Sequence, residues 1–113
     1  MSASADLVQR QLDAYNAQDI EAFMACYAED ALLAGLNGAV TQTGHHAIRA
    51  RHLDLFAQHP QNRAELASRI DLGSTVIDHE RVERMPGGER FEVAAIYTIR
   101  DGKIARVDFA RGA

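Results

Sequence analysis

Apolar residues near the N-terminus recur at the spacing of an amphipathic helix. Val8, Leu12 and Tyr15 are separated by four and three residues, so they share one face of a helix predicted over residues 4–18. Asp19 is a favourable N-cap residue, which predicts that a second and shorter helix begins there. This second helix has one apolar side, formed by Ile20, Phe23 and Tyr27. The chain is therefore predicted to begin with two consecutive helices.

A short β-hairpin and a third helix are predicted next. Residues 30–35 indicate a strand, the dipeptide Asn37-Gly38 is a strong turn signal, and residues 39–42 form the returning strand. Thr43 can cap the third helix, which ends at His59-Pro60 because a proline ring interrupts a helix. One face of this helix combines apolar and imidazole side chains. The residues on and beside it are Ile48, His52, Leu55, His59 and Phe56.

From Arg63 onward the apolar period changes to alternation, which is typical of half-buried strands. Turns at 73–74, 86–88 and 101–102 divide this part of the chain. The predicted strands are 66–72, on which Leu66, Ser68, Ile70 and Leu72 alternate, then 76–85, 91–99 and 104–110. Because the helices precede a run of antiparallel strands, the chain is predicted to be α+β. Helices lying in the concave side of a curved sheet would leave an open-ended cavity.

The composition is that of one globular domain. The chain has 113 residues, 47% hydrophobic and 25% charged, so a single domain over 1–113 is predicted. A net charge of -4 argues against a nucleic-acid partner, which would need a basic surface. No apolar run approaches a membrane span and the N-terminus lacks a secretory pattern, so we expect a cytoplasmic protein and no membrane partner. The single cysteine, Cys26, excludes an intrachain disulfide.

Four short motifs resemble the nuclear transport factor 2-like superfamily, in its SnoaL-like and ketosteroid-isomerase-like branch. They are Tyr-Asn-Ala-Gln-Asp at 15–19, Cys-Tyr-Ala-Glu-Asp-Ala at 26–31, Thr43-Gly44 with Ile48-Arg49, and Asp-Gly-Lys-Ile at 101–104. The resemblance implies a cystatin-like cone, in which three N-terminal helices pack on a curved, mostly antiparallel sheet of about six strands. It also implies a small-molecule pocket and a homodimer formed through the sheet. One fold hosts many functions, so these structural motifs do not define a reaction.

The residues that ketosteroid-isomerase-like members use for catalysis are not retained. Alignment places Gln11 at the position of the helical tyrosine, Gly35 at the carboxylate base and Ala95 at the hydrogen-bonding acid. These replacements argue against a steroid isomerase of that mechanism.

A second resemblance, to limonene-epoxide hydrolase, is faint. The spacing of its Arg-x-Asp motif is matched by Arg81-Val82-Glu83, and Asp108 lies near the position of the second acid. The ungapped alignment, however, puts Phe109 at that second position.

The charged strand 76–85 carries the best candidates for catalysis. Period two places Asp78 and Glu80 on one face, with carboxylates roughly 7 Å apart, and the resemblance favours this face toward the pocket. If both are desolvated, each raises the pKa of the other, and one could serve as a general base. Alternatively, both carboxylates pair with arginines of neighbouring strands or of a dimer mate.

Other polar candidates lie on the predicted pocket walls. His52 interrupts the apolar face of the third helix and could act as an acid, a base or a hydrogen-bond donor. Candidate ligand-binding residues are Gln11, Tyr15, Phe56 and Tyr97. Alternatively, His52 and the tyrosines are core residues whose polar atoms are satisfied within the protein.

The histidines do not suggest a metal site. His45, His52 and His59 are each seven residues apart, which is about 10.5 Å along a helix axis and too far for one ion to bridge. We expect neither a metal nor another cofactor.

Two functions remain open. The first is a pocket protein that binds a small hydrophobic molecule, and the second is an isomerase, cyclase or epoxide-hydrolase-type enzyme using a pocket carboxylate or histidine. A homodimer is expected because apolar side chains would otherwise be exposed on the outer sheet face. These are Ala94, Ile96, Ile77 and Met85.

Overall fold

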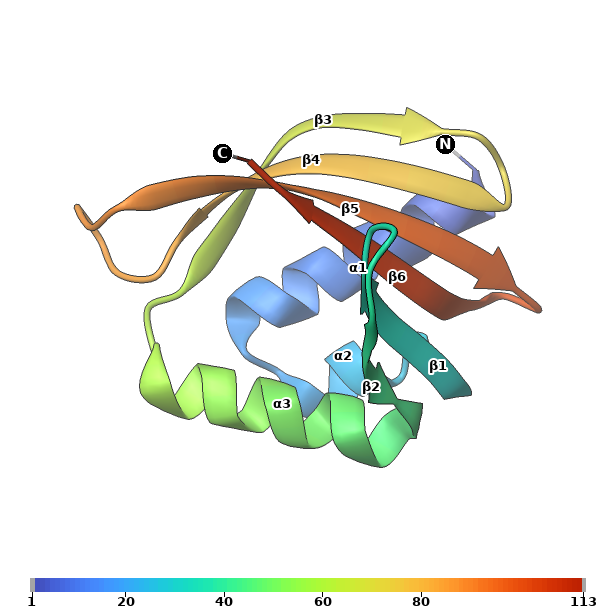
Figure 1. The fold of residues 1–113 in the computed structure, drawn as a ribbon, viewed down its shortest axis with the longest axis horizontal. Coiled ribbons are helices and arrows are strands. Elements are labelled where there is room, and N and C mark those ends of the chain that lie inside the picture. The colour runs from blue at the N-terminus through green and yellow to red at the C-terminus, as the bar shows by residue number, and fades with distance from the viewer. Residues whose placement is uncertain (1, 113) are drawn as a thin grey trace.

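The computed structural model describes residues 2–112, which form three helices and six strands (Figure 1). The helices are α1 (Ala3–Ala17), α2 (Ile20–Met24) and α3 (Gly44–Gln58). The strands are β1 (Tyr27–Gly35), β2 (Val40–Thr43), β3 (Arg63–Asp71), β4 (Thr75–Glu83), β5 (Arg90–Arg100) and β6 (Lys103–Arg111). Within residues 2–112 no helix is long and apolar enough to cross a membrane.

The strands form one six-stranded sheet in the order β2-β1-β6-β5-β4-β3. Neighbouring strands are antiparallel except β1 and β6, which run parallel. Figure 1 shows the sheet arching over α1, with α3 on the open side of the arch. The predicted α+β cone, with three N-terminal helices on a curved and mostly antiparallel sheet, is confirmed.

Capping geometry explains where the helices begin. The Asp19 side chain accepts a hydrogen bond from the Ala22 amide at 3.1 Å, as predicted for the N-cap of α2. The Ser2 hydroxyl accepts from the Ala5 amide at 3.0 Å and begins α1. Thr43 occupies the N-cap position of α3, but its side chain makes no capping hydrogen bond.

The prediction for the second helix was wrong in its length. This helix ends at Met24, so Cys26 lies in a turn and Tyr27 begins β1. The reason is tertiary pairing: the Ile104 amide donates to the Cys26 carbonyl at 2.9 Å, which joins β1 to β6. The Tyr27 side chain is thereby turned into the interior, where it is buried.

Strand β4 presents the face with the two carboxylates to the interior. Val76, Asp78, Glu80 and Val82 are all buried, whereas their neighbours on the other face are partly or fully exposed. The alignment-based preference for this face agrees with the structure. Two acidic side chains are therefore turned toward the helices.

A β-bulge in β3 breaks the simple alternation that we predicted for residues 66–72. The pairing register with β4 shifts between Leu66 and Ser68, so Arg69 comes to lie opposite Asp78. The bulge also reverses which side chains face outward, and Ile70 is 53% exposed. A single face shared by Leu66, Ser68 and Ile70 was therefore the wrong prediction.

Arg69 and Asp78 form a buried ion pair. Arg69 donates from Nε to Oδ1 at 2.7 Å and from Nη2 to Oδ2 at 2.9 Å. The side chains are 10% and 0% exposed. A third donor, Nη1, reaches the Gln9 side-chain oxygen at 2.9 Å, so the pair connects β3, β4 and α1.

Removing one partner of this pair should destabilise the fold strongly. We expect Asp78→Ala to lower the free energy of unfolding by about 3–5 kcal/mol, because Arg69 would keep a buried charge without a counterion. The free energy of unfolding of the double variant Arg69→Met/Asp78→Leu should lie much closer to that of the wild type, because no unpaired charge is left buried. Urea unfolding monitored by circular dichroism measures both. Equal losses in the single and double variants would contradict this interpretation.

Candidate functional site

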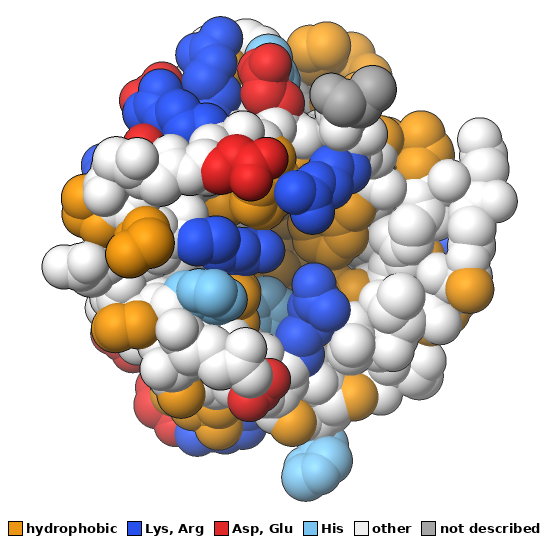
Figure 2. Space-filling model, turned by 60° about the vertical axis from the view of Figure 1, so that its left-hand side comes forward, with side chains coloured by type: hydrophobic (Ala, Val, Ile, Leu, Met, Phe, Trp, Pro, Cys, Tyr) orange, Lys and Arg blue, Asp and Glu red, His pale blue; other side chains and the backbone are white. Residues whose placement is uncertain are grey.

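A cavity of about 310 Å³ lies between α1, α3 and the inward face of the sheet. Figure 2 shows a hollow with hydrophobic side chains inside it and Arg or Lys side chains around its rim. Its volume is at the small end of the range for ligand pockets. Apolar side chains form much of the wall, including Leu12, Leu55, Val82, Val93 and Phe109. The site can therefore enclose a small apolar molecule, and its few polar groups decide what chemistry is available.

Glu80 lines this cavity with a carboxylate that has no ionic partner close by. The residue is 7% exposed, and its Oε2 is buried without a hydrogen-bond partner. Its cross-strand neighbours are Leu66 and Val93, which offer no charge. Burial, and secondarily the negative charge of Asp78, raises the pKa of Glu80 to about 7. Near neutral pH this group can both accept and donate a proton.

Asp78 is two residues away on the same face but differs from Glu80 in its surroundings. Both of its oxygens are bound by Arg69, and its side chain is 0% exposed. It does not line the cavity. Asp78 contributes to the site through its charge, which raises the pKa of Glu80.

Three polar side chains form a hydrogen-bonded chain across the base of the cavity. The Tyr27 hydroxyl donates to the Gln11 side-chain oxygen at 2.8 Å, and the Gln11 amide donates to the Tyr97 hydroxyl oxygen at 3.4 Å. In this arrangement the Tyr97 hydroxyl accepts from Gln11, so its own hydrogen remains to be donated. Burial raises the pKa values of Tyr27 and Tyr97 well above 10, so both hydroxyls stay protonated.

His52 lines the cavity as a neutral imidazole. Its Nδ1 lies 2.8 Å from the Ile48 carbonyl, which can only accept, so Nδ1 carries the hydrogen and Nε2 carries a lone pair. Burial, assisted by the positive charge of Arg51, lowers its pKa to about 4. The ring packs 4.5 Å from that of Phe23, centroid to centroid. His52 can therefore accept a hydrogen bond from a ligand at neutral pH.

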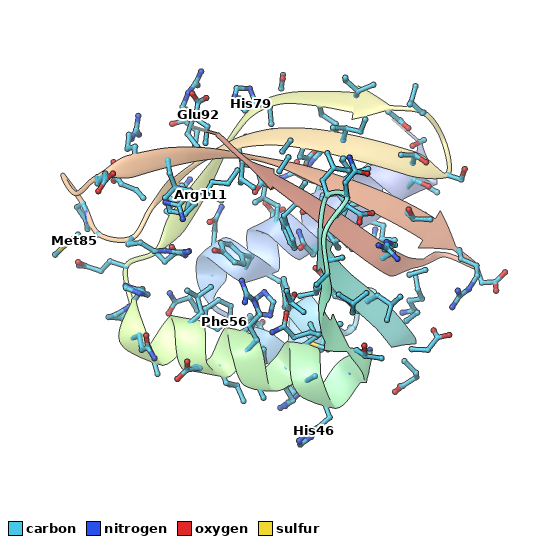
Figure 3. All side chains as sticks on the ribbon, in the orientation of Figure 1. His46, Phe56, His79, Met85, Glu92 and Arg111 are labelled. Carbon is cyan, nitrogen blue, oxygen red and sulfur yellow. The ribbon has the colours of Figure 1, made fainter. Side chains whose placement is uncertain are left out.

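Tyr15 connects the cavity wall to the rim. Asn62 donates to the Tyr15 hydroxyl at 2.7 Å and accepts from Arg84 Nη1 at 2.7 Å. Phe56 packs edge-on against the Tyr15 ring at 5.9 Å, but it does not line the cavity. Figure 3 shows Phe56 extending from α3 toward the helices beneath the sheet.

The structure brings most of the predicted site residues into one cavity. Those that line it are Gln11, Tyr15, His52, Glu80 and Tyr97, whereas Asp78 and Phe56 lie behind the wall. Sequence reasoning missed Tyr27, which it assigned to the core under the second helix. It also missed the rim arginines Arg51, Arg84 and Arg111. Each is an ordinary surface residue in the sequence, and only the fold brings the three together.

The cavity is lined by Val82 and Phe109 but not by the charged residues of the epoxide-hydrolase match, which are Arg81, Glu83 and Asp108. Arg81 faces outward, where it pairs with Glu65 and Glu92, and Asp108 is bound by Arg106. Among residues 2–112, no three His, Cys, Asp or Glu side chains are grouped so that they could hold a metal ion.

Helices packed on the concave face of a curved sheet, with a pocket between them, define a nuclear transport factor 2-like cone. A family model for the SnoaL-like domain matches residues 8–107, and the chain belongs to this family. No curated protein matches the sequence significantly.

Solved structures with the same fold include an uncharacterised cystatin-fold protein from Novosphingobium aromaticivorans. It is 32% identical to this chain with a TM-score of 0.90, covering 98% of this chain and 99% of that one. A presumed polyketide cyclase from Sinorhizobium meliloti is 25% identical, with a TM-score of 0.79 and coverage of 97% and 100%. Another from Pseudomonas putida is 26% identical, with a TM-score of 0.73 and coverage of 99% and 92%.

The raised pKa of Glu80 predicts how stability changes with pH. The folded chain binds this proton with a pKa of about 7, against an ordinary 4.5, so Glu80 lowers the stability as pH rises through that window. Replacing Glu80 with Gln removes the effect. The unfolding free energy of Glu80→Gln relative to wild type should therefore increase by roughly 3 kcal/mol between pH 4.5 and 8. Urea titrations across this range measure the difference.

The comparison between variant and wild type also removes the contribution of His52. Because its pKa is lowered to about 4, His52 has the opposite effect: the stability it adds is present above pH 6.5 and is lost as pH falls. That contribution is common to both proteins and cancels in the difference. A difference that does not change with pH would show that Glu80 has an ordinary pKa.

Proposed function

We propose that this protein is an enzyme that moves a proton on a small apolar carbonyl compound bound in the cavity, with Glu80 as the general base. The observation that carries the proposal is the Glu80 carboxylate, buried in the cavity with Oε2 unpartnered. A buried polar group without a partner costs stability and therefore needs an explanation, and a role in catalysis supplies one here. Its pKa of about 7 matches the pH at which a general base is most effective.

The other ionisable groups of the site are less suited to this role. His52, with a pKa of about 4, is a weak base and is not protonated near neutral pH. Asp78 has both oxygens bound by Arg69 and does not reach the cavity. Tyr27 and Tyr97 have pKa values well above 10 and serve as hydrogen-bond donors. Glu80 is thus the favoured proton acceptor.

The proposed reaction begins when Glu80 takes a proton from the carbon next to the carbonyl group. The electrons of that C–H bond form a carbon–carbon double bond, and the carbonyl π electrons move to oxygen. The Tyr97 hydroxyl donates a hydrogen bond to this oxygen and stabilises its negative charge. In a substrate with a β,γ carbon–carbon double bond, Glu80 then returns the proton to the γ carbon and the double bond moves into conjugation. Alternatively, the enolate carbon attacks a second carbonyl carbon of the same molecule and closes a ring, the π electrons of that carbonyl move to its oxygen, and Glu80 returns the proton to this oxygen. The similarity to presumed polyketide cyclases supports the second outcome.

A ligand-binding protein without turnover is the second candidate. It is favoured by Gly35 and Ala95, which occupy the positions where ketosteroid-isomerase-like members have carboxyl groups. The two candidates share the cavity and differ in whether Glu80 exchanges protons with the bound molecule. Proton exchange therefore separates them.

We expect the protein to catalyse hydrogen–deuterium exchange at the carbon next to the carbonyl of 1-tetralone in D₂O, followed by proton NMR. Glu80→Gln should lower the rate about 100-fold or more, which is a usual contribution of a general base. The wild-type rate should rise with pH and level off above about 7, as Glu80 becomes ionised.

Glu83→Gln is the matched control, because Glu83 lies on the outward face of the same strand and pairs with Arg90. This variant should keep the wild-type rate. If wild type and Glu80→Gln both bind 1-tetralone but exchange its hydrogens at the same rate, the result supports a ligand-binding protein without turnover. It contradicts the proposal that Glu80 is a general base.

We also propose that two copies associate through the outer face of the sheet. The centre of this face has small and apolar side chains in register, with Ile77 opposite Ile96 and Ala94 opposite Ala110. Polar side chains adjoin these residues, among them His79 and Glu92, which Figure 3 shows on the side of the sheet away from the helices. An apolar centre with adjoining polar side chains is typical of protein interfaces.

Light scattering at micromolar concentration should give twice the mass of the chain. The variant Ile96→Glu should give a monomer with unchanged circular dichroism, because a charge at the centre of the interface would be desolvated. A wild-type protein that is monomeric under these conditions would contradict the proposed dimer.

A further inference from the structure

The rim of the cavity has an unusual concentration of positive charge. Three arginines line it, and they come from separate parts of the chain: Arg51 from α3, Arg84 from the segment after β4, and Arg111 from the end of β6. Figure 2 shows Arg or Lys side chains on several sides of the opening. The whole chain, in contrast, has a net charge of -4. The positive charge at the opening is therefore a local feature.

These arginines differ from most others in the protein because they lack an acidic partner. Six arginines form ion pairs with Asp or Glu, namely Arg49, Arg69, Arg81, Arg90, Arg100 and Arg106. Among residues 2–112, no Asp or Glu oxygen lies within ion-pair distance of Arg51, Arg84 or Arg111. Glu89 lines an adjoining hollow together with Arg84 and Arg111, and Glu80 lines the same cavity as the three arginines.

Two of the three guanidinium groups are held close to one ring. The central carbons of Arg84 and Arg111 lie 5.0 and 3.9 Å from the centre of the Phe91 ring. Arg84 is fixed further by its hydrogen bond to Asn62. Figure 3 shows Arg111 extending from β6 into the space between the sheet and α3. Like charges gathered in this way repel each other, and an anion placed between them removes the repulsion.

The rim is separate from the carboxylate deeper in the cavity. Arg69 is the positive charge that lowers the pKa of Glu80. Between the two lies apolar wall formed by side chains such as Val82 and Val93. The cavity thus has a positive opening, an apolar middle and a proton acceptor inside.

We propose that Arg51, Arg84 and Arg111 bind the carboxylate of the substrate, which is a small apolar carboxylic acid with its reactive part directed inward. Guanidinium groups bind carboxylates with paired, charge-assisted hydrogen bonds. The apolar body of the molecule contacts the cavity wall, and its carbonyl-bearing end lies toward Glu80. This inference rests on the proposed function for the inner end of the molecule, but the binding of the carboxylate can be tested alone.

The test compares 2-naphthylacetate with its neutral amide, 2-naphthylacetamide, which has nearly the same shape and no charge. In isothermal titration calorimetry of the wild type, the Kd for 2-naphthylacetate should be lower than that for 2-naphthylacetamide by about tenfold or more. The preference should weaken as NaCl is raised, because exposed charges are screened. A Kd for the acid no lower than that for the amide, including binding of neither, overturns the proposal.

Substitution of the rim arginines locates the effect. Arg84→Gln and Arg111→Gln should each reduce the preference for the acid several-fold, and the triple variant with Arg51→Gln should abolish it. Arg10→Gln and Arg63→Gln are controls, because these arginines do not line the cavity. Persistence of the preference in the triple variant, with thermal unfolding showing it folded, overturns the assignment to the rim.

Glu80→Gln distinguishes this proposal from the proposed function. The variant should keep the preference for the acid while losing hydrogen exchange in 1-tetralone. If the wild type does not catalyse hydrogen exchange but binds the acid more tightly than the amide, the rim assignment is supported and the proposed enzymatic function is rejected. If the wild type catalyses hydrogen exchange but does not bind the acid more tightly than the amide, the proposed enzymatic function is supported and the rim assignment is rejected.

Discussion

The β-bulge between Leu66 and Ser68 determines which of the two buried carboxylates has a counterion. If the register that pairs Leu66 with Glu80 continued without a bulge, Ser68 would lie opposite Asp78; because the register shifts, Arg69 lies there. The pairing therefore leaves Asp78 neutralised and Glu80 between two apolar neighbours, Leu66 and Val93. Two carboxylates with the same orientation on one strand consequently acquire different chemistry. One holds β3, β4 and α1 together, and the other lines the cavity without a counterion.

The dependence of these side chains on strand register also explains which features could be predicted from the sequence. Helix starts such as Asp19 and the turns follow from local patterns, and these predictions agree with the structure. The inward face of β4 also agrees with the prediction, but that prediction came from the family resemblance, because alternation alone left both faces open. The bulge follows from pairing with a neighbouring strand, so the role of Arg69 could not be assigned. Tyr27 was misplaced for a similar reason, because the parallel pairing of β1 with β6 ends α2 early. Local order was predictable, and register was not.

Two of the three residues that the alignment places at catalytic positions of ketosteroid-isomerase-like members line the cavity, and neither carries the expected group. Gln11 and Gly35 line it where ketosteroid-isomerase-like members have a tyrosine and a carboxylate base. Here the carboxylate comes from β4, and the hydroxyl available for donation comes from Tyr97 on β5, oriented by Tyr27 and Gln11. A base that enters from another wall approaches the bound molecule from another direction. The mechanism therefore has to be argued from these side chains and cannot be transferred by alignment.

A contribution to stability does not explain why a glutamate occupies position 80. A buried carboxylate with a raised pKa and an unpartnered oxygen destabilises the folded state at neutral pH, and an apolar side chain would fit a position between Leu66 and Val93 better. Asp78, by comparison, forms strand-to-strand contacts that compensate for its burial. Sites where a fold retains a locally unfavourable group are where function is expected, since the group is completed by what binds there. On this argument we propose Glu80 as the marker of the functional end of the cavity.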